Sequence, residues 1–442
     1  MNVKQIIKKI VPKKILNARH FFFAYLGAKK YGFPSEELIV IGITGTSGKS
    51  SITDYLRQSL EACGLRVGSL STVDFYVAGE QKMNDQKMTM LGLAQIQQYL
   101  RKMVEAKCEI AIVETTSEGF LQYRHAFINY DIMMLTNLYP EHIESHGSFE
   151  NYKAAKLGIF EYVSTCKKKK AFDKKVAIVN GNNEYANEFL DKDFDEKYVF
   201  FRGDRDGHVK KTDNLELLIA DKVQVAKKGL NFSVDEDIFE APLYGEFTVM
   251  NLMAVYAVLQ ALDIPKEKIK KAFKSLHSVP GRLEFIPEAK EKGFEVIVDY
   301  AFEPIAIKAL YDVVELLEPK RVIHVFGGTG GGRDISRRFS VGEFVGKHAD
   351  IAIVTDEDPY DDDPMKIIED VSSAAIKVGK KEGQDLWKIL DRGEAIAQAV
   401  SLAKKGDIIL ITGKGSEQGM VVKGKIIPHD DRKKVRDVLF LK

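Results

Sequence analysis

The segment Ile43-Thr-Gly-Thr-Ser-Gly-Lys-Ser-Ser51 constrains the fold more than any other part of this 442-residue chain. It follows a short apolar run, residues 37–42, that is typical of a buried strand. Apolar residues then recur at helical spacing from 52 to 63. Glycines between a strand and a helix let backbone N–H groups face an anion, and a lysine there reaches terminal phosphates. The segment predicts a phosphate-binding loop, in a variant form because Ile43 stands where the general pattern has glycine. The alternative is a glycine turn that exposes a lysine.

Further apolar runs alternate with helical stretches along the chain, at 109–113, 131–135, 176–179, 295–298, 321–326, 351–355 and 407–412. This alternation predicts an α/β fold with mostly parallel sheets covered by helices. Short alternating runs in 208–243 indicate a small antiparallel patch. Pro280 and Gly281 mark a linker and a plausible hinge, because both residues break regular elements. We expect a basic amphipathic segment at 1–37, a phosphate-loop domain at 38–281 and a Rossmann-like domain at 282–442.

Charge and cysteine content exclude several classes of protein. The 65 basic and 64 acidic residues nearly cancel, so no global field favours nucleic acid as the partner. Three cysteines without paired spacing indicate neither a disulfide framework nor a zinc site, and we expect a cytoplasmic protein. The apolar run 21–28 is too short to span a bilayer. The basic segment around it either lies on an anionic membrane surface or docks on its own domain.

The phosphate loop and a series of later motifs, taken in order, resemble the Mur ligase superfamily. Its members use ATP to drive the formation of amide bonds. The resemblance runs from about Leu38 to the C-terminus and is closest to the tripeptide synthetases, which add the third residue to UDP-N-acetylmuramoyl-L-Ala-D-Glu. The motifs are Glu114-Thr-Thr-Ser-Glu-Gly119, Thr136-Asn-Leu-Tyr-Pro-Glu-His142, His146-Gly-Ser-Phe-Glu-Asn-Tyr-Lys-Ala-Ala-Lys156, Asn251, Gly281-Arg-Leu-Glu284, Val298-Asp-Tyr-Ala301, Gly327-Gly-Thr-Gly-Gly-Gly-Arg-Asp334, Asp356-Glu-Asp-Pro359 and Gly413-Lys-Gly-Ser-Glu417.

The resemblance implies ATP and Mg²⁺ as cofactors and assigns residues to them. The ATP-binding positions are Gly45, Thr46, Ser47, Gly48, Lys49, Ser50, Ser51, Asn251, Arg282 and Asp299. The metal positions are Ser50, Glu114, His142 and Lys156, the last as a carbamate formed with CO₂, and the catalytic positions are Lys49, Glu114, His142 and Lys156. From the residues alone, Glu114 ends a strand and should project near the phosphate loop, at the sheet edge where open α/β folds bind ligands.

The implied chemistry is activation of an acceptor carboxylate as an acyl phosphate, followed by attack of an amino acid's amine. The partners are therefore small molecules, and we expect a monomer. Positions that match contacts to the muramoyl-dipeptide acceptor are Thr89, Thr116, Gln122 and Arg124. For the amino acid we expect Arg333 to clamp a carboxylate and acidic residues to meet a cationic side chain; the substrate set is Arg333, Asp356, Asp358, Gly413 and Glu417.

The chain departs from the family pattern in three places. Diaminopimelate-adding relatives carry an arginine where this chain has Tyr360, which favours lysine or another monocarboxylate donor, although Arg333 or Arg337 could substitute. The usual histidine after Asp-Tyr-Ala is Phe302. Only about 38 residues precede the first strand, so we expect no domain for the UDP end of the acceptor. Two alternatives therefore remain: a ligase that acts on another carboxylate, such as a polyglutamate or storage peptide, and a non-catalytic nucleotide switch.

Overall fold

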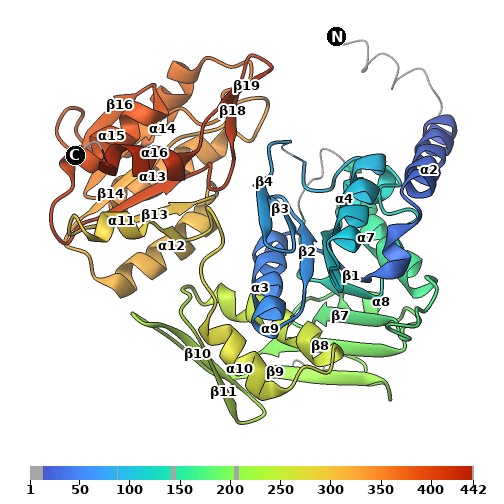
Figure 1. The fold of residues 1–442 in the computed structure, drawn as a ribbon. Coiled ribbons are helices and arrows are strands. Elements are labelled where there is room, and N and C mark those ends of the chain that lie inside the picture. Colours follow the sequence, from blue (N-terminus) through green and yellow to red (C-terminus); the bar gives the residue numbers. More distant parts are fainter. Residues whose placement is uncertain (1–12, 87, 141–145, 204–208, 441–442) are drawn as a thin grey trace. The chain divides into compact units, whose positions relative to one another are not determined.

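The computed structural model describes residues 13–86, 88–140, 146–203 and 209–440, which form two compact units (Figure 1). The first unit comprises most of the chain up to Leu276, and the second comprises His277 to the C-terminus with two short pieces, 225–228 and 243–245. Among the described residues, no helix has the length and apolar character needed to cross a membrane.

The first unit is built on an 11-stranded sheet of order β11-β10-β9-β8-β7-β6-β1-β5-β2-β3-β4. Its seven central strands, from β9 to β2, all pair in parallel with their neighbours in this group. The strands are β1 (Ile39–Thr44), β2 (Val67–Leu70), β3 (Asp74–Val77), β4 (Glu80–Met83), β5 (Ile110–Glu114), β6 (Ile132–Leu135), β7 (Val176–Asn180), β8 (Glu196–Arg202), β9 (Leu215–Ala226), β10 (Gly229–Val234) and β11 (Asp237–Ala241).

Helices cover this sheet because its central strands are apolar on both faces. Helices α4 (Leu93–Glu105), α7 (Phe149–Ser164) and α8 (Ala186–Leu190) share one core with the strands, while α3 (Lys49–Ala62), α9 (Phe247–Ala261) and α10 (Lys266–Lys274) pack together on the other face (Figure 1). The other helices in the described part of this unit are α2 (Lys13–Lys30), the 3₁₀ turn η1 (Pro34–Glu37) and α5 (Ser117–Leu121).

The second unit has a six-stranded sheet of order β12-β13-β17-β14-β15-β16, parallel except for β12. Two cores flank it, one under each helical layer. The strands of this sheet are β12 (Glu284–Phe285), β13 (Glu295–Asp299), β14 (Val322–Phe326), β15 (Ile351–Thr355), β16 (Leu386–Ile389) and β17 (Ile408–Thr412). A separate two-stranded hairpin is formed by β18 (Gly419–Val422) and β19 (Lys425–Pro428). The described helices of this unit are α11 (Pro287–Lys290), α12 (Pro304–Leu317), α13 (Ser336–His348), α14 (Pro364–Lys377), α15 (Arg392–Leu402) and α16 (Asp431–Phe440).

The predicted fold class is confirmed: two α/β units, each with a largely parallel sheet. One detail differs. The small antiparallel patch expected within 208–243 is the hairpin β10–β11, which continues the 11-stranded sheet at its edge. In the same stretch, however, β9 pairs parallel to β8 and so belongs to the parallel part of the sheet.

Candidate active site at the phosphate loop

The phosphate loop joins β1 to α3 at the carboxyl edge of the large sheet. Ile43 of β1 pairs with Glu114 of β5, and Thr44 pairs with Leu135 of β6, so three neighbouring strands end together. Side chains that follow these strands therefore lie beside the loop. The Thr136 hydroxyl donates to the Ser47 carbonyl at 2.7 Å, and the Thr46 and Ser47 amides donate to Asn137 Oδ1 at 3.1 and 2.8 Å.

Two lysines converge on one carbonyl oxygen of this loop. Lys49, the first residue of α3, and Lys156, from α7, each donate from Nζ to the Gly45 carbonyl at 2.9 Å. The two Nζ atoms are therefore separated by at most about twice the 2.9 Å hydrogen-bond length. Lys156 is buried and also contacts the Thr44 hydroxyl and the ring of Tyr152. Two ammonium groups this close repel each other, which favours an anion between them or a change of charge on one.

Glu114 lies on the other side of the loop and is buried. Its Oε1 accepts the Thr72 amide at 3.1 Å and its Oε2 accepts the Thr72 hydroxyl at 3.0 Å. Burial raises the pKa of Glu114, while the Lys49 charge and hydrogen bonds from Thr72 and Ser50 oppose that rise. The hydroxyls of Thr72 and Thr89 lie 2.9 Å apart, so Thr89 is joined to Glu114 through Thr72.

A cavity of about 280 Å³ opens beside these groups. It brings together Lys49 and Lys156 with three predicted acceptor-binding residues, Thr89, Thr116 and Arg124. The Arg124 guanidinium donates to the Met90 carbonyl and, at 2.6 Å, to Gln122 Oε1, which places Gln122 next to it. Four further polar residues of the quoted motifs, to which the sequence assigned no role, also line the cavity: Ser117, Glu118, His146 and Tyr152.

Asn251, on α9, also reaches the loop. Gly48 has φ +80°, and a Cβ there would stand 2.9 Å from Asn251 Oδ1. A larger residue at 48 would therefore be strained and would push against the asparagine. The predicted positions Gly45 to Ser51 and Asn251 lie together, whereas Arg282 and Asp299 belong to the second unit.

The oxygen donors at the loop suit a hard divalent cation. Within the described ranges, no three His, Cys, Asp or Glu residues are grouped so as to hold a metal ion. Glu114 and the Ser50 hydroxyl form a smaller set, which fits Mg²⁺ because that ion retains waters and binds substrate phosphates alongside one or two carboxylates. His142, the predicted histidine, lies outside the described residues.

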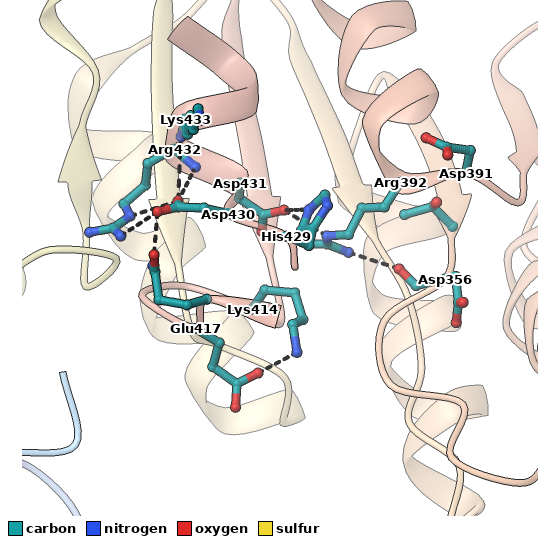
Figure 2. Close-up of polar contacts among 12 residues, drawn as sticks. Asp356, Asp391, Arg392, Lys414, Glu417, His429, Asp430, Asp431, Arg432 and Lys433 are labelled. Atoms are coloured by element: carbon teal, nitrogen blue, oxygen red, sulfur yellow. Dashed lines mark hydrogen bonds and ion pairs between the residues drawn. The ribbon is translucent and has the colours of Figure 1, made fainter. Parts of the chain in front are cut away.

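In the second unit, two predicted substrate residues, Asp358 and Glu417, already hold a cation of the chain. Lys414, fully buried after β17, donates to Asp358 at 2.8 Å and to Glu417, and Figure 2 shows the contact with Glu417. Burial lowers the pKa of Lys414, but the negative charges of Glu417 and Asp358 outweigh this effect and raise the pKa above its usual value. Asp358 also accepts the Val421 amide at 2.6 Å. These acids therefore fix the loop after β17 as well as offering carboxylate oxygens.

Glu357, between the two predicted aspartates, is the unusual carboxyl of this loop. Burial raises its pKa to about 7, against the opposing charges of Arg392 and Lys414. Gly413 lies against it, since a Cβ at 413 would stand 2.4 Å from Glu357 Oε2. Asp356 accepts the Glu357 amide at 2.8 Å, and burial raises its pKa too.

The buried ion pair between Arg392 and Asp431 holds the loops that follow β15 and β17. Arg392, at the start of α15, bonds both carboxylate oxygens of Asp431 at 2.8 Å and donates to the carbonyls of Asp356 and Thr412 (Figure 2). It thereby ties the ends of β15 and β17 to the start of α16. Arg392 and the His429 hydrogen bond hold the pKa of Asp431 well below its usual range, against the effect of burial.

The other predicted residues of this unit have separate settings. Arg333 lines a small cavity with Arg337 and Phe302. Asp299 accepts the amides of Leu283 and Ala301 at 2.6 and 2.7 Å, so it holds the chain turn after Gly281. Arg282 stacks over the Tyr300 ring at 4.1 Å.

Comparison with known proteins agrees with this architecture. Residues 43–259 match the Mur ligase middle domain and residues 281–415 match the Mur ligase glutamate ligase domain. The chain is similar to a UDP-N-acetylmuramyl-tripeptide synthetase of Roseiflexus sp. (strain RS-1), 33% identical over 96% of this chain and 83% of the relative. It is also similar to a UDP-N-acetylmuramoyl-L-alanyl-D-glutamate–2,6-diaminopimelate ligase of Alkaliphilus oremlandii (strain OhILAs), 30% identical over 95% and 81%.

A solved structure of a ligase with that second name superposes with a TM-score of 0.60 at 24% identity, covering 91% of this chain and 78% of the other. This likeness shows the fold. The two matched domains cover most of the chain, and the similarity to the Roseiflexus relative extends over both. The chain therefore belongs to the Mur ligase family, whose members are ATP-dependent, ADP-forming ligases that make amide bonds.

Proposed function

We propose that this ligase acts as a tripeptide synthetase. It adds an amino acid, a diamino acid such as lysine or diaminopimelate, to the carboxylate of a UDP-N-acetylmuramoyl-dipeptide-like acceptor in peptidoglycan precursor synthesis. The names of the two relatives support this choice. The observation that carries it is the cavity where Lys49 and Lys156 meet Thr89, Thr116 and Arg124, because a phosphate loop and a carboxylate-binding arginine share one space.

The phosphate-loop residues Gly45 to Ser51 hold the triphosphate through backbone N–H groups and the α3 N-terminus. Asn251 binds the nucleotide beside them, and Arg282 and Asp299 are further proposed nucleotide-binding residues. The acceptor carboxylate, held by Arg124 with Thr89, Thr116 and Gln122, attacks the γ-phosphorus and displaces ADP. Lys49 stabilises the charge on the transferring oxygens. The resulting acyl phosphate is attacked by the donor amine, which expels phosphate and leaves the amide.

Ser50 and Glu114, together with His142 and modified Lys156, are the proposed ligands of Mg²⁺. When bound, the ion neutralises phosphate charge that Lys49 alone does not cover. The Thr72 hydrogen bonds hold Glu114 in place, so its carboxylate is oriented before any ion arrives.

Lys156 is proposed to be carbamylated: its neutral amine adds to CO₂, a N–C bond forms and one proton is released. The support is electrostatic, since the change removes one of two cations that bond to the same carbonyl oxygen. Lys156→Ala should abolish ADP release, and a short carboxylic acid such as formate should restore part of it by replacing the lost anion. Lys156→Arg should stay inactive with formate, because its guanidinium still fills the site. If formate fails to rescue Lys156→Ala, the carbamate is refuted.

The amino acid is proposed to bind in the second unit, near Arg333, Asp356, Asp358, Gly413 and Glu417. Tyr360 takes the position where diaminopimelate-adding relatives have arginine, and its ring occupies the space beside Gly331. We therefore favour lysine as the donor. We also propose that the enzyme works as a cytoplasmic monomer and that its domains divide near residue 281.

ADP release with UDP-N-acetylmuramoyl-dipeptide and a panel of amino acids tests this proposal. We expect release that depends on both the acceptor and one basic or diamino donor, with lysine ahead of diaminopimelate. Release with a polyglutamate-type acceptor and glutamate instead would transfer the enzyme to that other substrate class. A matched reaction without amino acid reports uncoupled hydrolysis.

A further inference from the structure

Helix α2 packs on its own unit in an unusual way. Ala24 and Ala28 are buried, and Gly27 lies against α4, where a Cβ would stand 3.0 Å from Ala94 Cα. These small residues permit a close approach of the two helices. At the edge of this contact, the rings of Phe21 and Tyr25 pack on Phe127 of the same unit.

A second set of large apolar side chains on α2 points outward. Ile15, Phe22, Phe23 and Leu26 are 60%, 56%, 47% and 40% exposed. Positions 15, 19, 22, 26 and 29 follow helical spacing, so Arg19 and Lys29 share the stripe with these apolar residues. The Arg19 guanidinium lies 5.6 Å from the Phe23 ring centre. Contiguous exposed apolar surface of this kind indicates an interaction site.

Charge is segregated in the same part of the chain. Eight of the 65 basic residues and none of the 64 acidic residues lie in the first 35 positions, so the rest of the chain carries a formal charge of −7. The partner must therefore be anionic and also accept aromatic and aliphatic side chains. A bilayer surface with anionic lipids offers both at once.

We propose that the outward stripe of α2, formed by Ile15, Arg19, Phe22, Phe23, Leu26 and Lys29, docks this ligase on an anionic lipid bilayer. The aromatic side chains enter the interface between head groups and acyl chains, and the basic side chains contact the lipid head groups. A second copy is disfavoured as occupant, because it would bring two basic segments together. Nucleic acid would leave the Phe and Leu side chains in water. This inference is independent of the proposed acceptor and donor.

Vesicle flotation with the full chain tests it. Vesicles with 30% phosphatidylglycerol should bind the protein, and pure phosphatidylcholine vesicles should bind it at least ten-fold less, with binding to the former falling as salt rises. The variant Phe22→Ser/Phe23→Ser/Leu26→Ser should lose at least ten-fold of the affinity for anionic vesicles. Lys29→Glu/Lys30→Glu should lose affinity as well.

A matched control replaces three exposed isoleucines outside α2, Ile238→Ser/Ile305→Ser/Ile427→Ser, and should bind vesicles like the parent chain. Circular dichroism checks that each variant is folded. Equal binding of the α2 serine variant and the parent would overturn the proposal. So would a parent chain that ignores vesicles but forms a dimer in size-exclusion chromatography that the serine variant lacks, since α2 would then be a self-association face.

Discussion

Lys49 and Glu114 place opposite charges on the two sides of the phosphate loop. In the proposed mechanism, replacing Lys49 removes a cation that faces the transferring phosphoryl group, and replacing Glu114 removes a carboxylate ligand of Mg²⁺. We predict that Lys49→Ala and Glu114→Ala each lower ADP release by at least about 100-fold, the typical cost of removing one stabilising group. Lys153→Ala is the matched control on α7, because its amine pairs with Glu188 at 2.7 Å. Full turnover in Lys49→Ala or in Glu114→Ala would refute the assignment.

Glu357 makes the stability of the second unit pH-dependent. Its pKa rises from 4.5 to about 7 in the fold, so the folded state binds the proton more tightly than the unfolded chain. Its contribution to stability is complete below about pH 4.5 and is lost as pH rises through about 7. Glu357→Gln should therefore gain stability relative to the parent chain between pH 5 and 8, by up to about 3 kcal/mol.

Urea unfolding at pH 5 and at pH 8, monitored by the fluorescence of Trp387, measures this difference in unfolding free energy. Trp387 is the only tryptophan in the chain and lies on β16, in the same unit as Glu357. Glu343→Gln is the control, because Glu343 is exposed and its Lys347 partner lowers its pKa. It should change the pH dependence little and in the opposite direction. A parallel pH profile for Glu357→Gln and the parent would contradict the prediction.

Sequence motifs located Lys49, Glu114 and Lys156, because each belongs to a segment with several informative neighbours. They did not single out Thr72 or Lys414. Thr72 follows a four-residue strand, and nothing local signals that its hydroxyl bonds Glu114 from the adjacent strand end. Lys414 lies in a glycine-containing motif that gives no local sign of burial, yet it is buried and donates to two carboxylates. Such partners become visible only when strand order is known.

Strand prediction succeeded where both faces of a strand are buried. β1, β5 and β6 have continuous apolar runs, which parallel central strands require. β4 was missed because Glu80–Met83 is polar and mostly exposed, at the far edge of the sheet. Edge strands are specified by their neighbour's backbone rather than by their own hydrophobicity, so a single sequence indicates them weakly.

The loop after β17 packs against the chain turn at Gly281, and this contact can be tested. Gly281 has φ +65°, and a Cβ there would stand 2.0 Å from the backbone nitrogen of Ser416. Gly383 has a similar φ of +77° with nothing within 4 Å of the added atom. Gly383→Ala should cost about 1–2 kcal/mol of unfolding free energy from backbone strain alone.

Gly281→Ala carries the same strain and also forces the backbone at Ser416 to move. We expect it to cost at least about 2 kcal/mol more than Gly383→Ala. Urea unfolding followed by Trp387 fluorescence compares the two variants directly. Equal losses of unfolding free energy in the two variants would contradict the prediction, because the loop beside Gly281 would then move aside without a cost in stability.

At the scale of the whole molecule, each unit has its own buried core, so each can unfold in its own transition. The proposed ATP-binding set nevertheless divides between them, with Asn251 and the phosphate loop in the first unit and Arg282 and Asp299 in the second. A ligand should stabilise each unit whose residues hold it, since anything that binds only the native state raises its stability by mass action.

Trp387 separates the two contributions, because its fluorescence reports on the second unit while circular dichroism reports on the whole chain. We predict that a non-hydrolysable ATP analogue with Mg²⁺, at about 100 times its Kd, raises both melting midpoints, through about 2.7 kcal/mol of stabilisation. Lys49→Ala should remove both shifts, because the triphosphate no longer binds. Arg282→Ala should remove the fluorescence shift and keep most of the dichroism shift. If Arg282→Ala leaves the Trp387 midpoint as responsive as in the parent chain, then Arg282 takes no part in holding the nucleotide.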